Sequence, residues 1–391
     1  MSFKGLKIGI PKEIMTDEKR VAATPEIVGK MVKEQAKLLV EAGAGMGSFF
    51  TDEQYKAAGA EMVDDVEKLF DVSDLILKVK EPRFSIKKGK HEVDMMKNGQ
   101  YLITFLHPAS PHNHQMVQKL AEKGVIGISL DSIPRISRAQ NMDALTSMST
   151  VAGYKAVLLA ANMLPAFIPM ITSAVGISQP AVTLVIGAGV AGLQALATAK
   201  RLGAIVYAAD IRPEASEQAM SLGAKIIDVN VPPEVAVGEG GYAKTLPEKW
   251  LVEEQKALQQ SVAKADILIL TALIPGRVAP ILVTDQMVKS MKTGSVIIDV
   301  AIDQGGNCEI SEAGKVITKH GVNIDGIQNI PSMMPKSSTL MFANNMYNLV
   351  KYLVKNGKLT LDMEDEIIAS ALVTRDGKII HAGTLEAMNL S

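Results

Sequence analysis

The residues with the clearest chemical meaning lie at positions 181–210, in the segment AVTLVIGAGVAGLQALATAKRLGAIVYAAD. An apolar β-type run is followed there by a glycine loop, a helical run, a second β-type run and a terminal acid. In this order Gly187 permits a tight turn, Gly189 lets the backbone approach a pyrophosphate, and Gly192 lets the helix pack closely on the strand. The free N–H groups at the start of the helix then face the phosphates. The pattern predicts a dinucleotide site.

The acid that ends the second β-type run indicates which dinucleotide is bound. Asp210 can accept hydrogen bonds from a ribose 2′-OH and would repel a 2′-phosphate, which predicts NAD(H) rather than NADP(H). Arg212 argues the other way, because a nearby arginine can accommodate a 2′-phosphate. A glycine turn can also be purely structural. A predicted helix over residues 190–202 that ends at Gly203 supplies the context that favours nucleotide binding.

Composition and charge exclude several classes of function. The 391 residues include 41 basic and 42 acidic side chains, without the basic surplus of a nucleic-acid binder. Cys308 is the only cysteine, so no intrachain disulfide can form. His107, His112 and His114 are close in sequence, but without clustered cysteines or carboxylates we expect no metal site. The start, MSFKGLKIGIPKE, lacks the apolar core of a signal peptide, which favours a cytoplasmic protein.

One long segment without charge could be mistaken for a membrane span. It runs from Lys155 to Lys200 and is interrupted by Pro165, Pro169 and Pro180. These prolines divide it into pieces too short to cross a bilayer as one helix. We therefore expect no direct membrane insertion.

The order of β-type and helical runs predicts an α/β protein with two Rossmann-like doubly wound parallel-sheet domains. Runs such as LKIGI, DLILKV, YLITFL and VIGISL alternate with helical patterns before residue 150, and a second alternating series begins near Pro180. The last 57 or so residues are too few for a core of their own. We therefore expect an N-terminal domain of residues 1–148 plus 336–391, with a nucleotide domain of residues 149–335 inserted in it. Helices near 149–164 and 337–355 would connect the two halves across a cleft.

Two shorter segments contain turn signals. Asp376-Gly377 separates two apolar runs in VTRDGKII, which predicts a hairpin. The glycine-rich stretch 231–249, which contains Tyr242, is compatible with a solvated surface loop or with a lid that closes on bound nucleotide.

A polar stretch at the predicted domain boundary could hold a nicotinamide ring. The segment IPRISRAQNMDALTSMST, residues 133–150, offers Arg135, Gln140, Asp143 and Thr146. A nicotinamide site needs a few such polar groups to fix the carboxamide and hold the ring against its hydride partner. The alternative is an ordinary polar loop followed by a helix start.

Several motifs together resemble a known family. PRISRAQNMDALTSMSTVAGYKAV is similar to the nicotinamide-contacting loop of the alanine dehydrogenase and pyridine nucleotide transhydrogenase family, and the likeness continues through ADIRPEASEQAMSLGA, GGYAK, TALIPG, GSVIIDVAIDQGGNCE and VTRDGKIIHAG. It is closest to the branch that forms the NAD(H)-binding component of proton-translocating transhydrogenases. The resemblance implies that Arg135, Gln140, Asp143 and Thr146 position the dihydronicotinamide, with Thr146 in place of an expected serine.

The resemblance also implies a set of nucleotide contacts and a mobile loop that carries Tyr242. The implied contacts are Gly187, Gly189, Val190, Ala191, Gly192, Asp210, Ile211, Arg212, Tyr242, Ala272 and Leu273.

A second set of residues resembles the substrate-binding and catalytic positions of the dehydrogenase branch. Arg20 and Lys80 could pair with the carboxylate and carbonyl of a 2-oxo acid, while His107 exchanges protons and Asp303 orients the developing ammonium group. Each has an ordinary alternative: a strand-end charge for Arg20 and Lys80, a hydrogen-bonded histidine for His107, and a turn former for Asp303. Direct hydride transfer between two nicotinamides requires none of the four.

Three functions follow as hypotheses. The leading one is the NAD(H)-binding subunit of a proton-translocating transhydrogenase. As implied partners it would have membrane-spanning and NADP(H)-binding subunits, and a second copy in a homodimer. It would lie at the cytoplasmic face of the membrane, and NADP(H) would be held only by a partner. The second is a free-standing NAD-dependent alanine dehydrogenase. The third, a nucleotide sensor without turnover, leaves the polar stretch 133–150 unexplained.

Overall fold

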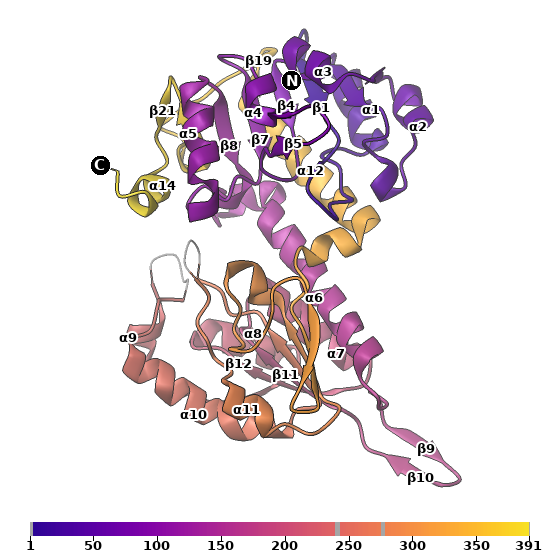
Figure 1. The fold of residues 1–391 in the computed structure, drawn as a ribbon, viewed down its shortest axis with the longest axis vertical. Helices are drawn as coiled ribbons and strands as arrows, with labels where there is room; N and C mark the ends of the chain where they lie inside the picture. The colour runs from indigo at the N-terminus through magenta and orange to yellow at the C-terminus, as the bar shows by residue number, and fades with distance from the viewer. Residues whose placement is uncertain (1–2, 239–242, 275–277, 391) are drawn as a thin grey trace. The chain divides into compact units, whose positions relative to one another are not determined.

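The computed structural model of the protein describes residues 3–238, 243–274 and 278–390 (Figure 1). The chain forms two compact units: unit 1 comprises Met1–Met148 with Ser332–Ser391, and unit 2 comprises Ser149–Pro331. Unit 2 thus interrupts unit 1 in the sequence. It ends at residue 331 rather than the expected 335, within the short helix η7 (Ile330–Met333).

Unit 1 is built on an eight-stranded sheet in the order β21-β20-β8-β7-β4-β1-β2-β3. The strands from β8 to β3 pair in parallel, whereas β20 and β21 extend the β8 edge antiparallel. The sheet is therefore mixed at one edge, not wholly parallel as expected. Its strands are β1 (Lys7–Ile10), β2 (Lys37–Glu41), β3 (Glu61–Val63), β4 (Leu75–Leu77), β7 (Tyr101–Thr104), β8 (Ile126–Ser129), β20 (Leu372–Arg375) and β21 (Lys378–Ile379). Two small ribbons add β5 (Phe84–Ser85) with β6 (Lys90–His91), and β18 (Val354–Lys355) with β19 (Lys358–Leu359).

Several helices of unit 1 begin where the sequence supplies a cap. Thr24 accepts a hydrogen bond from the N–H of Ile27 at the start of α1, and Thr51 forms a capping box at the start of α2. Apolar side chains of the sheet and its helices, such as Leu102 and Val117, are buried in one cluster. The helices are α1 (Pro25–Lys33), α2 (Asp52–Ala57), α3 (Val66–Val72), α4 (Glu92–Met95), α5 (His114–Glu122), α12 (Pro335–Leu353), α13 (Glu366–Ala371) and α14 (Ala382–Ala387).

Unit 2 contains a seven-stranded sheet in the order β13-β12-β11-β14-β15-β17-β16. All neighbours pair in parallel except β16, which is antiparallel to β17 at the edge. The order reverses between β11 and β14, and open α/β sheets bind ligands beyond the carboxyl ends of the strands at such a point. The strands are β11 (Val182–Ile186), β12 (Ile205–Ala209), β13 (Lys225–Ile226), β14 (Ile267–Leu270), β15 (Val296–Asp299), β16 (Val316–Lys319) and β17 (Val322–Asp325).

Helices cover both faces of this sheet, as the doubly wound fold requires. Val185 of β11 belongs to a core cluster with residues of α7 and α8, whereas its neighbour Leu184 belongs to a second cluster with residues of α10 and α11. Successive side chains of a strand point to opposite faces, so these clusters lie on opposite sides of the sheet. The helices are α7 (Val190–Arg201), α8 (Pro213–Ser221), α9 (Pro233–Ala236), α10 (Glu248–Lys264) and α11 (Asp285–Lys289).

The two long apolar helices differ from their expected roles. The helix expected at 149–164 is α6 (Ala144–Met163), which begins in unit 1 and continues into unit 2. The helix expected at 337–355 is α12, which lies wholly in unit 1 and does not link the units, because the chain has already returned to unit 1 at Ser332. Of the described helices, α6 alone is long and apolar enough to cross a membrane by length and composition, and half of its most apolar stretch is buried inside the structure.

Two hairpins complete the fold. The hairpin predicted at Asp376-Gly377 is confirmed: it joins β20 and β21, and both turn residues have positive φ, 51° and 77°. The other, β9 (Ile171–Ser173) with β10 (Gly176–Ser178), was not predicted, and it projects from the rest of unit 2 (Figure 1). All residues of its two strands are exposed.

Candidate functional site

The glycine turn between β11 and α7 has the geometry that its sequence predicts. Gly187 has a φ of +91°, and a Cβ added there would lie 2.7 Å from the amide nitrogen of Ala272. A Cβ on Gly192 would lie 1.9 Å from the carbonyl oxygen of Gly187, so α7 packs directly on the turn. A Cβ on Gly189 would meet only the Arg212 guanidinium, at 3.9 Å. Packing thus requires the outer glycines, whereas the space at Gly189 is open.

Helix α7 presents its amino end at this turn. Val190 and Ala191 form its first turn and are half-buried, and the first N–H groups of a helix have no acceptor within it. The helix ends at Arg201, followed by Leu202 as the cap and by Gly203 with a φ of +93°, as predicted. The amino end of α7 can therefore bind an anion at the carboxyl edge of the sheet.

Asp210 is tied to the glycine loop and to Arg212. Its Oδ2 accepts a hydrogen bond from the N–H of Ala188 at 2.7 Å, and the Nε and Nη2 of Arg212 donate to Oδ1 and Oδ2 at 2.9 and 2.8 Å. The hydrogen bond to Asp210 raises the pKa of Arg212. The guanidinium is thus directed at its own carboxylate neighbour. Ile211, between them, packs against the apolar cluster on the α10 side of the sheet.

The segment that follows β14 is hydrogen-bonded to a residue that the sequence analysis missed. Buried Asn307 accepts a hydrogen bond from the N–H of Ala272 at 3.0 Å and donates to its carbonyl at 2.9 Å. Thr271 donates to the carbonyl of Gly187 at 2.6 Å, which joins this strand end to the glycine turn. Leu273 follows and is 39% exposed. Asn307 stands in the motif GGNCE, but only the fold brings it to Ala272. Tyr242 lies outside the described residues.

The predicted nicotinamide loop belongs to unit 1 and leads into α6. Thr146 donates from its N–H and its hydroxyl to the carboxylate of Asp143, at 2.8 and 2.6 Å, so the pair caps the helix. Arg135 and Gln140 are exposed. Of the four predicted residues, Asp143 and Thr146 are therefore hydrogen-bonded to each other, whereas Arg135 and Gln140 lie on the surface of the same loop.

His107 has a half-buried partner, Asp131, that the sequence analysis did not identify. Its Nδ1 lies 2.6 Å from Oδ1 of Asp131, and its backbone N–H donates to Oδ2 at 2.7 Å. Burial alone would lower the pKa of His107, but the Asp131 carboxylate raises it; burial would raise the pKa of Asp131, but His107 and Ser129 lower it to about 2. His107 also has a φ of +43°, which few residues other than glycine adopt. The aspartate thus fixes the ring and favours its charged form.

The remaining residues of the dehydrogenase set are divided between the units. Arg20, Lys80 and His107 lie in unit 1, on segments that follow the carboxyl ends of β1, β4 and β7, whereas Asp303 lies in unit 2. Arg20 is 3% exposed and forms an ion pair with Glu18. Lys80 is half-buried and acts electrostatically on His107. Asp303 accepts a hydrogen bond of 3.3 Å from the N–H of Asn329.

A buried carboxyl near Asp210 was also missed. Glu254 of α10 is 5% exposed, on the face that carries the core residues Leu258 and Val262. Burial, together with the negative charge of Asp210, raises the pKa of Glu254 to about 7. The helical pattern does not predict the burial of Glu254, because glutamate is common in helices and only the tertiary packing buries it.

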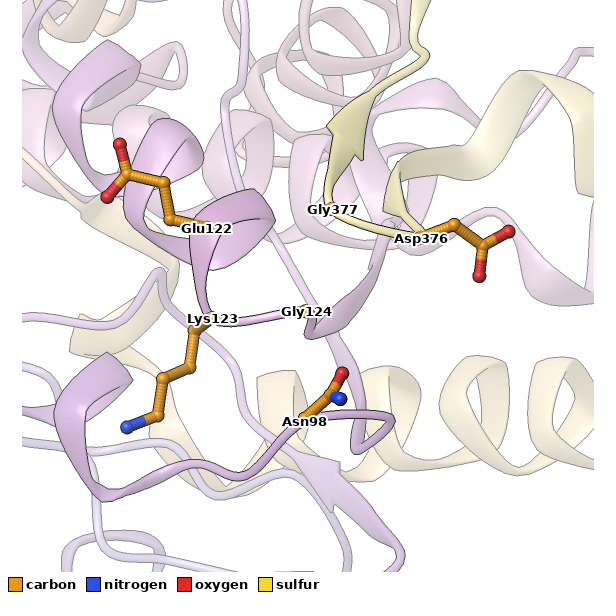
Figure 2. Close-up of a pocket in the computed structure, with 6 residues that line it drawn as sticks. All are labelled: Asn98, Glu122, Lys123, Gly124, Asp376 and Gly377. Atoms are coloured by element: carbon orange, nitrogen blue, oxygen red, sulfur yellow. The ribbon is translucent and has the colours of Figure 1, made fainter.

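A depression on unit 1 does not have the lining of a binding site. An open depression of about 600 Å³ in unit 1 is lined by Asn98, Glu122, Lys123, Gly124, Asp376 and Gly377. Figure 2 shows the carboxylates of Glu122 and Asp376 pointing in opposite directions, so the lining does not converge on a ligand. Over residues 3–238, 243–274 and 278–390, no group of three or more histidine, cysteine, aspartate or glutamate side chains could hold a metal ion.

Comparison with known proteins gives a match over nearly the whole chain. Residues 9–152 match the family described as "Alanine dehydrogenase/PNT, N-terminal domain", and residues 156–382 match "Alanine dehydrogenase/PNT, C-terminal domain". The chain is 43% identical to a protein of Rhodospirillum rubrum that is named as the first part of NAD(P) transhydrogenase subunit alpha, covering 96% of this chain and 98% of that one. It is 34% identical to "Alanine dehydrogenase" of Bacillus subtilis, covering 96% and 92%.

The fold agrees with the same two groups of proteins. A solved transhydrogenase from Sinorhizobium meliloti has a TM-score of 0.83 at 39% identity, covering 96% of this chain and 100% of that one. A solved L-alanine dehydrogenase has a TM-score of 0.82 at 28% identity, covering 98% and 99%. Backbone shape therefore does not separate the two groups, whereas sequence identity is higher to the transhydrogenases.

Proposed function

The chain belongs to the alanine dehydrogenase/PNT family, and on this premise we propose that it is the NAD(H)-binding subunit of a proton-translocating NAD(P) transhydrogenase. The observation that carries the proposal is the 43% identity to the Rhodospirillum rubrum transhydrogenase polypeptide across almost the full length of both chains. The alignment spans both family domains matched in this chain. An alanine dehydrogenase of similar length is only 34% identical.

The cofactor of this chain is NAD(H). The open space at Gly189 and the amino end of α7 would hold the pyrophosphate. Asp210 would accept hydrogen bonds from the adenosine ribose and disfavour a 2′-phosphate, while Arg212 is engaged by Asp210. Ala272 and Leu273 would border the adenosine. NADP(H) would be held by a partner subunit.

In this proposal the chain's own residues orient the nicotinamide of NADH for hydride transfer. NADH supplies, when bound, a hydride to the nicotinamide of NADP+, so no side chain has to exchange a proton. Gln140 and Arg135 are exposed on their loop and can contact the carboxamide, while Asp143 and Thr146 fix the start of α6 beside them. Correct placement of reacting groups is the main contribution available to such a site.

One specific observation favours a second candidate, an NAD-dependent alanine dehydrogenase. His107 is held by Asp131 at 2.6 Å in a positive-φ conformation, an arrangement suited to acid–base chemistry on an amino acid. Arg20 and Lys80, the residues expected to meet the carboxylate and carbonyl, lie in the same unit, where Arg20 pairs with Glu18.

One pair of assays distinguishes these functions. Purified protein is given NADH and an NADP+ analogue together with the NADP(H)-binding component of a transhydrogenase, and separately NAD+ with L-alanine. We expect hydride exchange that falls about 10-fold or more in Gln140→Asn, because a shorter side chain loses its carboxamide contact. His107→Ala should leave that exchange within about twofold of the parent protein, because no proton transfer is involved.

The opposite pattern would overturn the assignment. Deamination of L-alanine that disappears in His107→Ala would identify a dehydrogenase. Binding of NADH without either activity would identify a nucleotide sensor.

The relatives' names imply a complex of several subunits, and we propose three kinds of partner: membrane-spanning subunits, an NADP(H)-binding subunit and a second copy of this chain. The protein would then lie at the cytoplasmic face of the membrane through those subunits.

For the homodimer the hairpin β9–β10 is the best candidate surface. Val175 is 99% exposed and Ile177 is 61% exposed, and residues 165–179 contain no charged side chain. Such a projecting apolar arm is more stable when a second copy covers it.

The dimer is tested by molar mass. Light scattering should give twice the chain mass of 41.8 kDa for the parent protein and the single mass for Ile177→Lys, because a charge then enters the buried contact. Val316→Lys is the control, since Val316 is 52% exposed on the edge strand β16 of the same unit. A dimer that survives Ile177→Lys would contradict the role of the hairpin.

A further inference from the structure

The loop with the predicted nicotinamide contacts packs against the C-terminal segment of unit 1 and is hydrogen-bonded to it. Within it, residues Ser137–Met142 form the 3-10 helix η4, which contacts α12. The side-chain amides of Asn345 and Asn348, one helical turn apart on α12, both donate to the carbonyl oxygen of Asn141, at 3.0 and 3.1 Å. One backbone carbonyl thus receives two side-chain donors, so both of its lone pairs are used.

A second attachment holds the loop three residues earlier. Nη1 of Arg138 donates to the hydroxyl of Tyr352 at 2.8 Å and to Oδ2 of Asp365 at 2.9 Å, and the Tyr352 hydroxyl donates to the same carboxylate. Asp365 also caps α13 by accepting from the N–H of Ile367 at 2.9 Å. Burial would raise the pKa of Asp365, but its hydrogen bonds with Tyr352 and Arg138 lower it to about 2. The carboxylate therefore stays charged throughout the physiological range.

Gln140 lies between these attachments. Its neighbours Ala139 and Met142 are 0% and 2% exposed, so apolar packing fixes the loop on the inner side. Arg138 and Asn141 are fixed by hydrogen bonds to residues more than 200 positions away in the sequence. Gln140 itself is exposed. The loop around the exposed Gln140 side chain is thus fixed at four positions: 138, 139, 141 and 142.

We propose that Asn345, Asn348 and the Arg138–Tyr352–Asp365 group are positioning residues that hold Gln140 in the orientation needed for hydride transfer. This inference rests on the proposed function. The C-terminal segment, distant in sequence from the nucleotide motif, then belongs to the transfer apparatus. A looser loop would spread Gln140 over more conformations, and a displacement of about 1 Å at such a site can reduce a rate by about 100-fold.

The test uses Asn348→Asp, which keeps the size of the side chain but turns an acceptor toward the Asn141 carbonyl. We expect amide hydrogen exchange across residues 137–142 to become about 10-fold faster, since the loss of one such hydrogen bond corresponds to about that factor. Hydride transfer to the NADP(H)-binding component should fall by a similar factor, whereas the Kd for NADH changes less than about twofold, because the phosphate and ribose contacts lie elsewhere. Arg138→Gln is a second variant on the other attachment. Asn344→Ala is the control, because Asn344 is exposed on the same helix and donates only to Leu340 of that helix.

The outcomes separate the two proposals. Unchanged amide exchange in both variants would show that these hydrogen bonds do not hold the loop. Faster exchange with an unchanged transfer rate would refute the positioning role. If the parent protein transfers no hydride to the NADP(H)-binding component, the proposed function fails, whatever the exchange data show.

Discussion

Gly192→Ala lowers the affinity for NADH by about 100-fold, the equivalent of about 2.7 kcal/mol. The added Cβ would lie 1.9 Å from the carbonyl oxygen of Gly187 and 3.1 Å from Oγ1 of Thr271, and neither group can move away easily. Thr271 is hydrogen-bonded to that same carbonyl at 2.6 Å, and the turn is part of the buried strand end. Helix α7 must therefore shift outward, and its amino end then no longer meets the pyrophosphate. Overpacking of this kind also costs about 1–3 kcal/mol of folding stability.

Gly189→Ala is the matched comparison, because its Cβ meets only a guanidinium at 3.9 Å. We expect it to leave the thermal unfolding of the free protein nearly unchanged but to weaken NADH binding, since the methyl group occupies the space of the ligand. Titration by NADH fluorescence and thermal denaturation of both variants separate the two roles. An affinity in Gly192→Ala within threefold of the parent value would contradict the close-packing argument. Binding of NADPH as tightly as NADH by the parent protein would contradict the NAD(H) assignment.

The parts of the fold that could be predicted are those in which neighbouring residues decide the structure. The glycine turn, the end of α7 at Gly203 and the hairpin at Asp376-Gly377 each depend on backbone conformations that few residues adopt. Their sequence signals are therefore strong. The hairpin β9–β10 was not predicted: Gly176 has a φ of +130°, but the apolar residues around it sit in a segment that also resembles buried structure. The antiparallel pairing of β20 with β8 and of β16 with β17 was likewise not predicted, since strand direction depends on the connection and not on the strand itself.

The parts of the site that could not be predicted depend on residues distant in sequence. Asp131 approaches His107 because β7 and β8 are parallel neighbours and both segments follow their carboxyl ends. Asn307 reaches Ala272 in the same manner from beyond β15, the neighbour of β14. The pairing of strands brings these groups together, and an isolated sequence does not reveal which polar residue after one strand meets which residue after the next.

The buried carboxyl on α10 leads to a second large effect, on stability rather than on binding. Glu254 has a pKa of about 7 in the folded protein, against the usual 4.5, because burial and the charge of Asp210 disfavour its ionised form. Between these two pH values the unfolded chain releases the proton while the folded chain keeps it. The free energy of unfolding therefore falls as the pH rises through this window, and by pH 8 the carboxyl has lowered it by about 3 kcal/mol.

Glu254→Gln should remove this dependence, because the amide resembles the protonated carboxyl and does not ionise. We expect the difference in the free energy of unfolding between variant and parent to grow by about 2.5 kcal/mol in favour of the variant from pH 5 to pH 8, as measured by urea denaturation. Other carboxyls with a raised pKa, such as Glu13, are present in both proteins and cancel in the difference. Glu253→Gln is the control, since Glu253 neighbours Glu254 on the same helix but is partly exposed and paired with Lys256. Parallel curves for Glu254→Gln and the parent would mean that Glu254 ionises at its ordinary pKa in the folded protein.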